Sequence, residues 1–300
     1  MAGTVEELLA GYAREAHAGR THLVAVRGRR DLSEALGLAP SRDEGVESGE
    51  GRCGSRPLPQ LVSALSFDIA EVRASDLRVL SADARACSAA LIVDNSLPTV
   101  FGCRPLLHGA QVCFEELLRL EGRERPLVCA VSTSPARTRG HAVSCDPALL
   151  DVVDAGARRW AACLGADELS CLESRLEGLP GQVRARNDLA AVAAEYLRCH
   201  PSVSFVSYPG LAGDPNRSCA ASVLELGFGP VVGFGLRQER PVGALMSRMR
   251  STGCRSRLHA VRRPGSEAQE FRLLCDGADD PEALVGALED VLLETVRGER

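Results

Sequence analysis

The sequence contains no lysine, so all 35 of its lysine-plus-arginine residues are arginine. On a protein surface the two side chains carry charge about equally well, and most of these arginines need no special explanation. At a catalytic position the two differ, because arginine stays protonated and is a poor nucleophile, whereas a lysine amine can form a Schiff base. These 300 residues therefore exclude covalent catalysis by a lysine side chain.

Several familiar kinds of site are also missing. The twelve cysteines are scattered singly from Cys53 to Cys275, and the six histidines show no metal-ligand spacing, so we predict reduced thiols and no metal site. Gly227 to Gly235 lacks the G-x-G-x-x-G spacing of a dinucleotide loop, and the sequence has no P-loop and no nucleophile elbow.

Charge and hydropathy exclude two classes of partner. A formal net charge of −5 gives no indication of the basic surface that binding to nucleic acid or to an anionic membrane requires. Residues 1–18 have the pattern of an amphipathic helix, which is neither a signal peptide nor a membrane span. These features predict a cytoplasmic protein.

The first half of the chain alternates between strand and helix patterns. Short apolar runs predict buried parallel strands, and the segments between them have helical periodicity. These runs cover residues 22–26, 90–93, 111–114 and 127–131. The pattern predicts an α/β large lobe over residues 1–150, with a solvated flexible loop near 39–59.

The second half predicts a smaller α+β lobe over residues 151–300. Helical patterns occupy residues 146–178, 189–198 and 281–297, and strand-like runs occupy 203–207 and 231–236.

The small lobe resembles a known family. "CHPSVSFVSYPGLAGDPNRSCAASVLELGFGPVVGFGL" (199–236) is similar to the H-P-x-V-x-x-V-x-Y-P-G-L segment and following strand of the pyridoxal-phosphate enzymes of cysteine and methionine metabolism. "FRLLCDGADDPEALVGALEDVL" (271–292) resembles the family's closing strand and helix. The resemblance covers roughly residues 77–293 and implies a fold-type-I pyridoxal-phosphate transferase, with a mostly parallel sheet in the large lobe and a small α+β C-terminal lobe.

Two stretches of the large lobe carry the implied cofactor site. "ALIVDNSLP" (90–98) resembles the family's V-V-D-N-T-F segment, which places Asp94 at the pyridinium-binding carboxylate and Ser96 at the neighbouring hydroxyl. Without that resemblance, Asp-Asn-Ser after a strand is a plain Asx turn. "GAQVCFEELLRLEGRERPLVCAVS" (109–132) resembles the family's lysine segment and places Arg119 at the Schiff-base position.

The same resemblance implies that the site is degenerate. Glu116 and Leu118 fall where the family has hydroxyls that bind the cofactor phosphate, and a carboxylate there would repel the dianion. Arg272 falls at the carboxylate-binding arginine, although a surface ion pair explains it equally well. Ser251 begins "STGCRSRL", which resembles the family's S-L-G-G-x-E-S-L substrate segment. Compared with the family, the chain is expected to be shortened before residue 77.

Two functions remain open at this point. The first is a non-catalytic homologue of the sulfur amino acid enzymes, which acts as a homo-oligomer or pairs with a full-length paralogue. The alternative is an active lyase or transferase in which pyridoxal phosphate is held without a covalent bond, or in which a partner chain completes the site.

Overall fold

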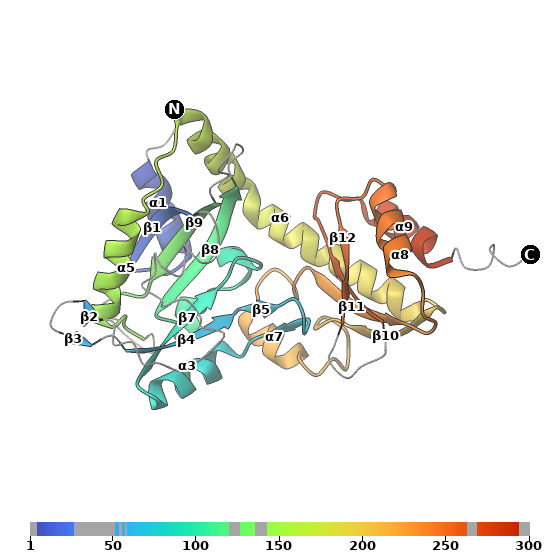
Figure 1. The fold of residues 1–300 in the computed structure, drawn as a ribbon, viewed down its shortest axis with the longest axis horizontal. Coiled ribbons are helices and arrows are strands. Elements are labelled where there is room, and N and C mark those ends of the chain that lie inside the picture. The colour runs from blue at the N-terminus through green and yellow to red at the C-terminus, as the bar shows by residue number, and fades with distance from the viewer. Residues whose placement is uncertain are drawn as a thin grey trace, which may run out of the picture. The chain divides into compact units, whose positions relative to one another are not determined.

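The computed structural model describes residues 5–26, 52–53, 56–57, 59–119, 127–135, 143–262 and 269–293 (Figure 1). The chain divides into two compact units. The first unit contains Met1–Ser66 and Asp76–Leu179, and the second contains Phe67–Ser75 and Pro180–Arg300.

The first unit is built on a five-stranded sheet. In spatial order its strands are β1 (Arg20–Val26), β9 (Leu127–Thr133), β8 (Val112–Arg119), β7 (Ala89–Asp94) and β4 (Gln60–Leu65). The β4–β7 and β7–β8 pairs are parallel, and the β8–β9 and β1–β9 pairs are antiparallel. Four of these five strands therefore point in the same direction and β9 points the opposite way, so the predicted α/β fold with a mostly parallel sheet is confirmed.

Helices cover both faces of this sheet (Figure 1). They are α1 (Val5–Glu15), α3 (Leu77–Ala86), α4 (Thr99–Gly102), the 3₁₀ helix η1 (Pro105–His108), α5 (Pro147–Arg159) and the first part of α6 (Ala166–Cys199). Side chains alternate between the faces of a strand, so Cys129 packs in a cluster with Leu149 of α5, whereas Val128 packs in another with Tyr12 of α1. A sheet covered on both faces needs apolar residues at successive positions, which explains why all six residues of β7 are buried.

Local signals fix the starts of two of these helices. The Asp146 carboxylate accepts a hydrogen bond from the Ala148 amide at 2.8 Å at the start of α5, and the Asp76 carboxylate accepts one from the Val79 amide at 3.1 Å at the start of α3. Each carboxylate satisfies an amide that has no partner within the helix.

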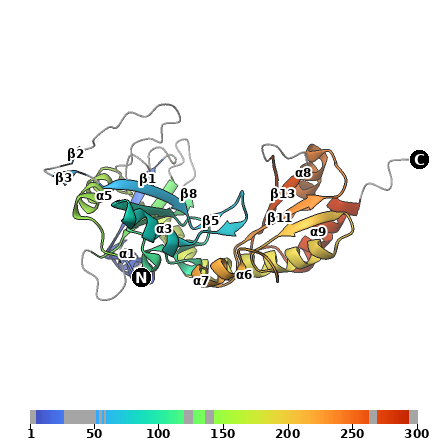
Figure 2. The same cartoon turned by 90° about the horizontal axis from the view of Figure 1, so that it is seen from below.

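The second unit is an antiparallel sheet with helices packed on it (Figures 1 and 2). The strand order is β10 (Val203–Ser207), β11 (Val231–Leu236), β13 (Glu270–Leu274) and β12 (Arg257–Val261). The helices are the rest of α6, α7 (Arg217–Val223), α8 (Val242–Ser251) and α9 (Pro281–Leu293). A large hydrophobic cluster lies between this sheet and α6, α8 and α9, and it includes Phe234, Phe271 and Leu288.

A short hairpin from the first half of the sequence belongs to the second unit. Its strands are β5 (Phe67–Asp68) and β6 (Arg73–Ala74). The Asn216 side chain holds β6 through two hydrogen bonds, one from the Ala74 amide at 2.8 Å and one to the Ala74 carbonyl at 3.0 Å.

The structure differs from the sequence-based expectations in three places. The expected boundary at residue 150 falls inside α5, which packs on the first sheet, and the two units meet along the chain at Leu179 and Pro180. Strand β9 is not parallel to its neighbours, because the antiparallel β8 and β9 are joined by a short connection and parallel strands would need a long crossover. The helical stretches near 146–178 and 189–198 are instead α5 and a single long α6 that continues through Pro180.

Burial explains the continuity of α6. Leu172, Leu179, Val183 and Leu189 are at most 3% exposed, so their packing stabilises the helix through Pro180, a residue that disfavours the interior of a helix. Most of the loop expected near 39–59 lies outside the described residues. In the part that is described, β2 (Arg52–Cys53) pairs with β3 (Arg56–Pro57).

Candidate functional site

Asp94 and Ser96 lie together where β7 ends. The Asp94 carboxylate accepts a hydrogen bond from the Ser96 amide at 2.9 Å, which is the geometry of an Asx turn. The Ser96 hydroxyl accepts one from the Glu116 amide of β8 at 3.1 Å. The turn therefore ties the carboxyl end of β7 to the neighbouring parallel strand β8, and carboxyl ends of strands are where ligands usually bind to an α/β sheet.

A buried carboxylate that the sequence analysis did not single out lies beside this turn. Glu115 of β8 is 2% exposed, and its Oε1 atom accepts a hydrogen bond from the Asn95 amide group at 2.7 Å. The Oε2 atom accepts bonds from the Val100 amide at 3.0 Å and from the Tyr12 hydroxyl of α1. This Glu115 cluster (Glu115, Asn95, Val100 and Tyr12) links α1, the β7 turn and α4 to one carboxylate.

Burial shifts the titration of the cluster. Desolvation raises the pKa of Glu115 from 4.5 to about 7, although the hydrogen bonds from Tyr12, Asn95 and Val100 act in the opposite direction. Burial also raises the pKa of the Tyr12 hydroxyl and of the Cys113 thiol, and the nearby Glu115 carboxylate raises both further. The Glu115 carboxyl is therefore the group in this cluster that titrates near neutral pH.

Arg119 lies apart from the Asp94 turn. It is the last residue of β8 and its side chain is exposed. Asp94 pairs with Phe114, and Arg119 lies five residues farther along the same strand. At about 3.3 Å per residue, this places the backbones of Asp94 and Arg119 on the order of 16 Å apart. Of the residues expected at the cofactor, the structure brings Asp94 and Ser96 together and leaves Arg119 at the strand end.

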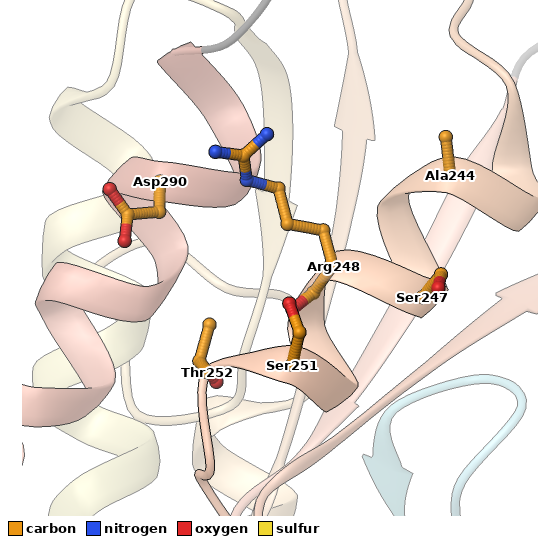
Figure 3. A pocket seen from close by; sticks show the side chains of 6 residues that line it. All are labelled: Ala244, Ser247, Arg248, Ser251, Thr252 and Asp290. Carbon is orange, nitrogen blue, oxygen red and sulfur yellow. The ribbon is translucent and has the colours of Figure 1, made fainter.

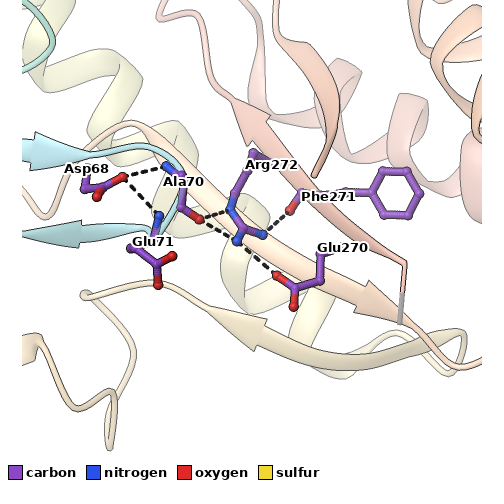
Figure 4. A network of polar contacts seen from close by, with 6 residues as sticks. All are labelled: Asp68, Ala70, Glu71, Glu270, Phe271 and Arg272. Atoms are coloured by element: carbon purple, nitrogen blue, oxygen red, sulfur yellow. Dashed lines mark hydrogen bonds and ion pairs between the residues drawn. The ribbon is translucent and has the colours of Figure 1, made fainter. Parts of the chain in front are cut away.

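Arg272 is buried in the middle of β13, and other groups of its own unit already occupy its guanidinium (Figure 4). The Nε and Nη2 atoms donate to the Ala70 carbonyl at 2.8 and 2.6 Å. Nη1 donates to the Phe271 carbonyl at 3.0 Å, and Nη2 forms a 3.0 Å ion pair with Glu270. Arg272 is therefore not a surface ion-pair residue, because its side chain is only 2% exposed.

The surroundings of Arg272 are shaped to hold it there. The Asp68 carboxylate accepts hydrogen bonds from the amides of Ala70 and Glu71 at 2.8 and 3.1 Å, which fixes the turn that presents the Ala70 carbonyl (Figure 4). Gly233 pairs with Arg272 on the neighbouring strand, and a Cβ at Gly233 would lie 3.2 Å from Nη1. The guanidinium thus fastens the β5–β6 hairpin to the sheet of the second unit.

Ser251 lies at the end of α8, beside a shallow polar cavity of about 440 Å³ (Figure 3). Its hydroxyl donates to the Arg248 carbonyl at 2.7 Å. The cavity is lined by Ala244, Ser247, Arg248, Ser251, Thr252 and Asp290. Arg272 does not line this cavity, so the two residues expected to bind substrate do not share a pocket there.

Two further expectations concern metals and membranes. Among the described residues, no three His, Cys, Asp or Glu side chains lie close enough together to hold a metal ion. No helix in the described part of the chain is long and apolar enough to cross a membrane.

Comparison with known proteins identifies the family. Residues 69–256 match the family described as Cys/Met metabolism PLP-dependent enzymes. A Streptomyces coelicolor protein that carries the name of a cystathionine gamma-lyase is 32% identical over 240 residues, which cover 73% of this chain and 56% of that protein. An O-acetyl-L-homoserine sulfhydrylase of Leptospira meyeri is 24% identical over 192 residues, which cover 54% of this chain and 43% of that protein.

Solved structures show the same fold. A methionine gamma-lyase of Micromonospora echinospora aligns with a TM-score of 0.71 at 20% identity, over 96% of this chain and 85% of that chain. A cystathionine gamma-synthase of Xanthomonas oryzae aligns with a TM-score of 0.66 at 18% identity, over 95% of this chain and 84% of that chain. The fold is therefore the fold-type-I architecture of pyridoxal-phosphate enzymes.

The chain belongs to the Cys/Met metabolism family of pyridoxal-phosphate-dependent enzymes. It spans about half the length of the curated relatives that it matches, with 56%, 43% and 41% of the first three covered.

The residues of this chain do not fit the family's cofactor. None of the 300 residues is a lysine, so no side-chain amine is available for a Schiff base. In β8, Glu116 and Leu118 occupy the positions where the family's pattern has phosphate-binding hydroxyls, and neither a carboxylate nor an alkyl side chain supplies a hydroxyl donor there.

Proposed function

We propose that this chain is a non-catalytic member of the Cys/Met metabolism family that acts by binding other chains. One observation carries the proposal: the sequence has no lysine, and Arg119 stands where the resemblance places the Schiff-base residue. A guanidinium stays protonated at neutral pH, so it can neither form an aldehyde adduct of that kind nor abstract a proton.

The second unit supports the same proposal. In the family's pattern Arg272 would bind the substrate carboxylate, but here its donors go to Ala70, Phe271 and Glu270. A substrate carboxylate would have to displace the Ala70 carbonyl and compete with the buried Glu270 carboxylate. The arginine is retained, and its contacts are structural.

The experiment is a titration with pyridoxal phosphate followed by borohydride reduction and peptide mass spectrometry. In a protein without lysine, the only primary amine is the N-terminal amine, so we expect no reduced adduct within the family-matched residues 69–256. We also expect no visible absorbance band that survives gel filtration.

Three chains separate the loss of lysine from the loss of the rest of the site. They are the unmodified chain, Arg119→Lys, and the triple variant Arg119→Lys, Glu116→Ser and Leu118→Thr. We expect Arg119→Lys alone to give no stable adduct, because Glu116 and Leu118 still offer no phosphate-binding hydroxyl. Lyase activity on cystathionine by the unmodified chain would overturn the proposal and favour a non-covalently held cofactor or a site completed by a partner chain.

The proposed binding role includes self-association or pairing with a full-length paralogue. Val79 of α3 and Leu107 of the neighbouring η1 are 53% and 47% exposed, so these two elements offer apolar surface on which another chain could pack. We expect light scattering to report a dimer, and Val79→Glu with Leu107→Glu to shift it toward monomer. Val192→Glu on α6, where the side chain is 42% exposed, is the matched control. A monomer that stays unchanged when a full-length relative is added would contradict this part.

A further inference from the structure

The second unit contains a second groove, separate from the cavity beside Ser251. It lies between α8 and β12, with a cavity volume of about 530 Å³. Met249 and Leu258 form an apolar wall, and both are buried members of the core of the second unit. Arg250, Arg255 and Arg257 also line the groove.

The groove is strongly basic although the chain is acidic. His259 joins the three arginines, and Asp276 is the only carboxylate among the lining residues. Pro241 to Ser266 contains six arginines and no aspartate or glutamate, whereas the whole chain has a formal net charge of −5. Positive charge is therefore concentrated in one segment, as expected where an anion binds.

Two of these arginines are available to a ligand. Arg250 and Arg257 are exposed, and in the described part of the chain their guanidinium groups form no hydrogen bond or ion pair. Arg255 lies near Asp279, whose carboxylate also accepts the Arg255 amide at 2.8 Å. The unpaired charge of the groove therefore centres on Arg250 and Arg257.

One wall of the groove is a sheet edge. Strand β12 pairs with β13 from Arg257–Leu274 to Val261–Glu270, and it is the last strand of the described sheet. An edge strand leaves backbone N–H and C=O groups open to another strand. Arginine side chains along such an edge repel a basic strand and attract an acidic one, so they select the partner as well as prevent aggregation.

We propose that this groove docks an acidic, extended peptide segment of a partner protein. The peptide adds as a strand to the edge of β12, its carboxylates reach the exposed guanidinium groups of Arg250 and Arg257, and its apolar side chains face Met246, a partly exposed apolar residue of the groove. A peptide of alternating acidic and apolar residues fits both the arginines and the apolar side of the groove, because successive side chains of a strand point to opposite sides. No Phe, Tyr or Trp lines the groove, so it lacks the large stacking platforms typical of sites for single-stranded nucleic acid. The inference does not depend on the proposed loss of catalysis.

The test is fluorescence anisotropy with the intact chain and defined peptides. The probe is a labelled peptide of about ten residues that alternates glutamate and valine, the upper end of ordinary strand length. The control is a peptide of the same length in which each glutamate is replaced by glutamine. We expect the glutamate peptide to bind at least about ten-fold more tightly, because hydrogen bonds to charged groups are stronger than those between neutral groups. We also expect its affinity to fall as salt rises from about 0.01 to about 0.1 M.

Variants locate the site. Arg250→Gln with Arg257→Gln should weaken the glutamate peptide at least about ten-fold. Arg184→Gln with Arg198→Gln removes the same charge from exposed positions on α6 that already pair with Asp188 and Glu195, and should leave binding unchanged. N-methylation of alternate peptide amides should abolish binding if the peptide adds as a strand.

Three results would overturn the proposal. The glutamate peptide fails to bind the unmodified chain, or it binds equally well after the Arg250 and Arg257 substitutions. In the third, single-stranded DNA of equal charge binds as tightly as the peptide and loses affinity in the same variant, which would make the groove a general anion site.

Discussion

Replacing Glu115 by glutamine should change how the stability of the first unit depends on pH. Burial raises the pKa of Glu115 to about 7 in the folded chain, compared with 4.5 for an ordinary glutamate. The folded state therefore binds this proton more tightly than the unfolded state does. Its contribution to stability is fully present below about pH 4.5 and is lost as the pH rises through about 7.

The size of the effect follows from the shift. Each pKa unit corresponds to about 1.4 kcal/mol, so this group should remove on the order of 2–3 kcal/mol of unfolding free energy between about pH 5 and about pH 8. Glutamine has nearly the same shape but carries no charge at any pH. Its single carbonyl oxygen can replace only one of the two carboxylate oxygens, the one facing Asn95 or the one facing the Val100 amide, and this cost does not change with pH. Relative to the unmodified chain, Glu115→Gln should therefore become more stable as the pH rises.

Urea unfolding followed by tryptophan fluorescence measures this difference. Trp160 is the only tryptophan of the chain, and it packs against the core of the first unit. Glu115 belongs to the same unit. Other carboxylates titrate in both proteins, so the informative quantity is the difference between the two unfolding free energies at each pH. Glu116→Gln, at the next position of β8, controls for removing one carboxylate from this strand. A difference between Glu115→Gln and the unmodified chain that stays constant from about pH 5 to about pH 8 would refute the reasoning.

Three further predictions concern positions where a specific contact or backbone angle explains the expected loss of stability. Arg272→Leu should lower the unfolding free energy by about 3–5 kcal/mol in urea titrations followed by circular dichroism, because it leaves the buried Glu270 carboxylate unpaired; adding Glu270→Leu should recover part of that loss, and no recovery would contradict the pairing. Gly109→Ala should destabilise the first unit by at least about 1 kcal/mol in the tryptophan assay, since φ is 98° and a Cβ would meet the Ser81 hydroxyl at 2.2 Å; an unchanged midpoint would argue against this packing. Asp146→Ala should cost about 1 kcal/mol in the same assay by removing the cap of α5, and Asp146→Asn should retain most of the stability.

Regular elements with strong local signals could be predicted from the sequence. The apolar run before Asp94 predicted β7, and the expected strands at 203–207 and 231–236 coincide with β10 and β11. The continuous α6 could not be predicted, because its stability comes from buried leucines packed against other elements and its local Gly and Pro residues indicate a break.

The site shows the same difference between local and distant causes. Asp94 and Ser96 were predicted together because they are two residues apart, and the Asx turn that forms between them is local. The contact of Arg272 could not be predicted, since its acceptor is a backbone carbonyl 202 residues away. Glu115 did have a usable signal, because alternation puts it on the same face of β8 as the buried Cys113 and Leu117.

The bond between Arg272 and the Ala70 carbonyl sets an order for the folding of a newly made chain. Synthesis at about 5–20 residues per second leaves the β5–β6 hairpin waiting roughly 10–40 seconds before its guanidinium partner emerges, 202 residues later. Every strand described for the first sheet is synthesised before Arg272. The second unit, in contrast, is completed only when the early hairpin segment Phe67–Ser75 can pack with the late strand β13. A fragment that starts at Pro180 would lack the Ala70 carbonyl, which accepts from Nε and Nη2 of Arg272, so we expect the second unit to be less stable as that fragment than as part of the whole chain.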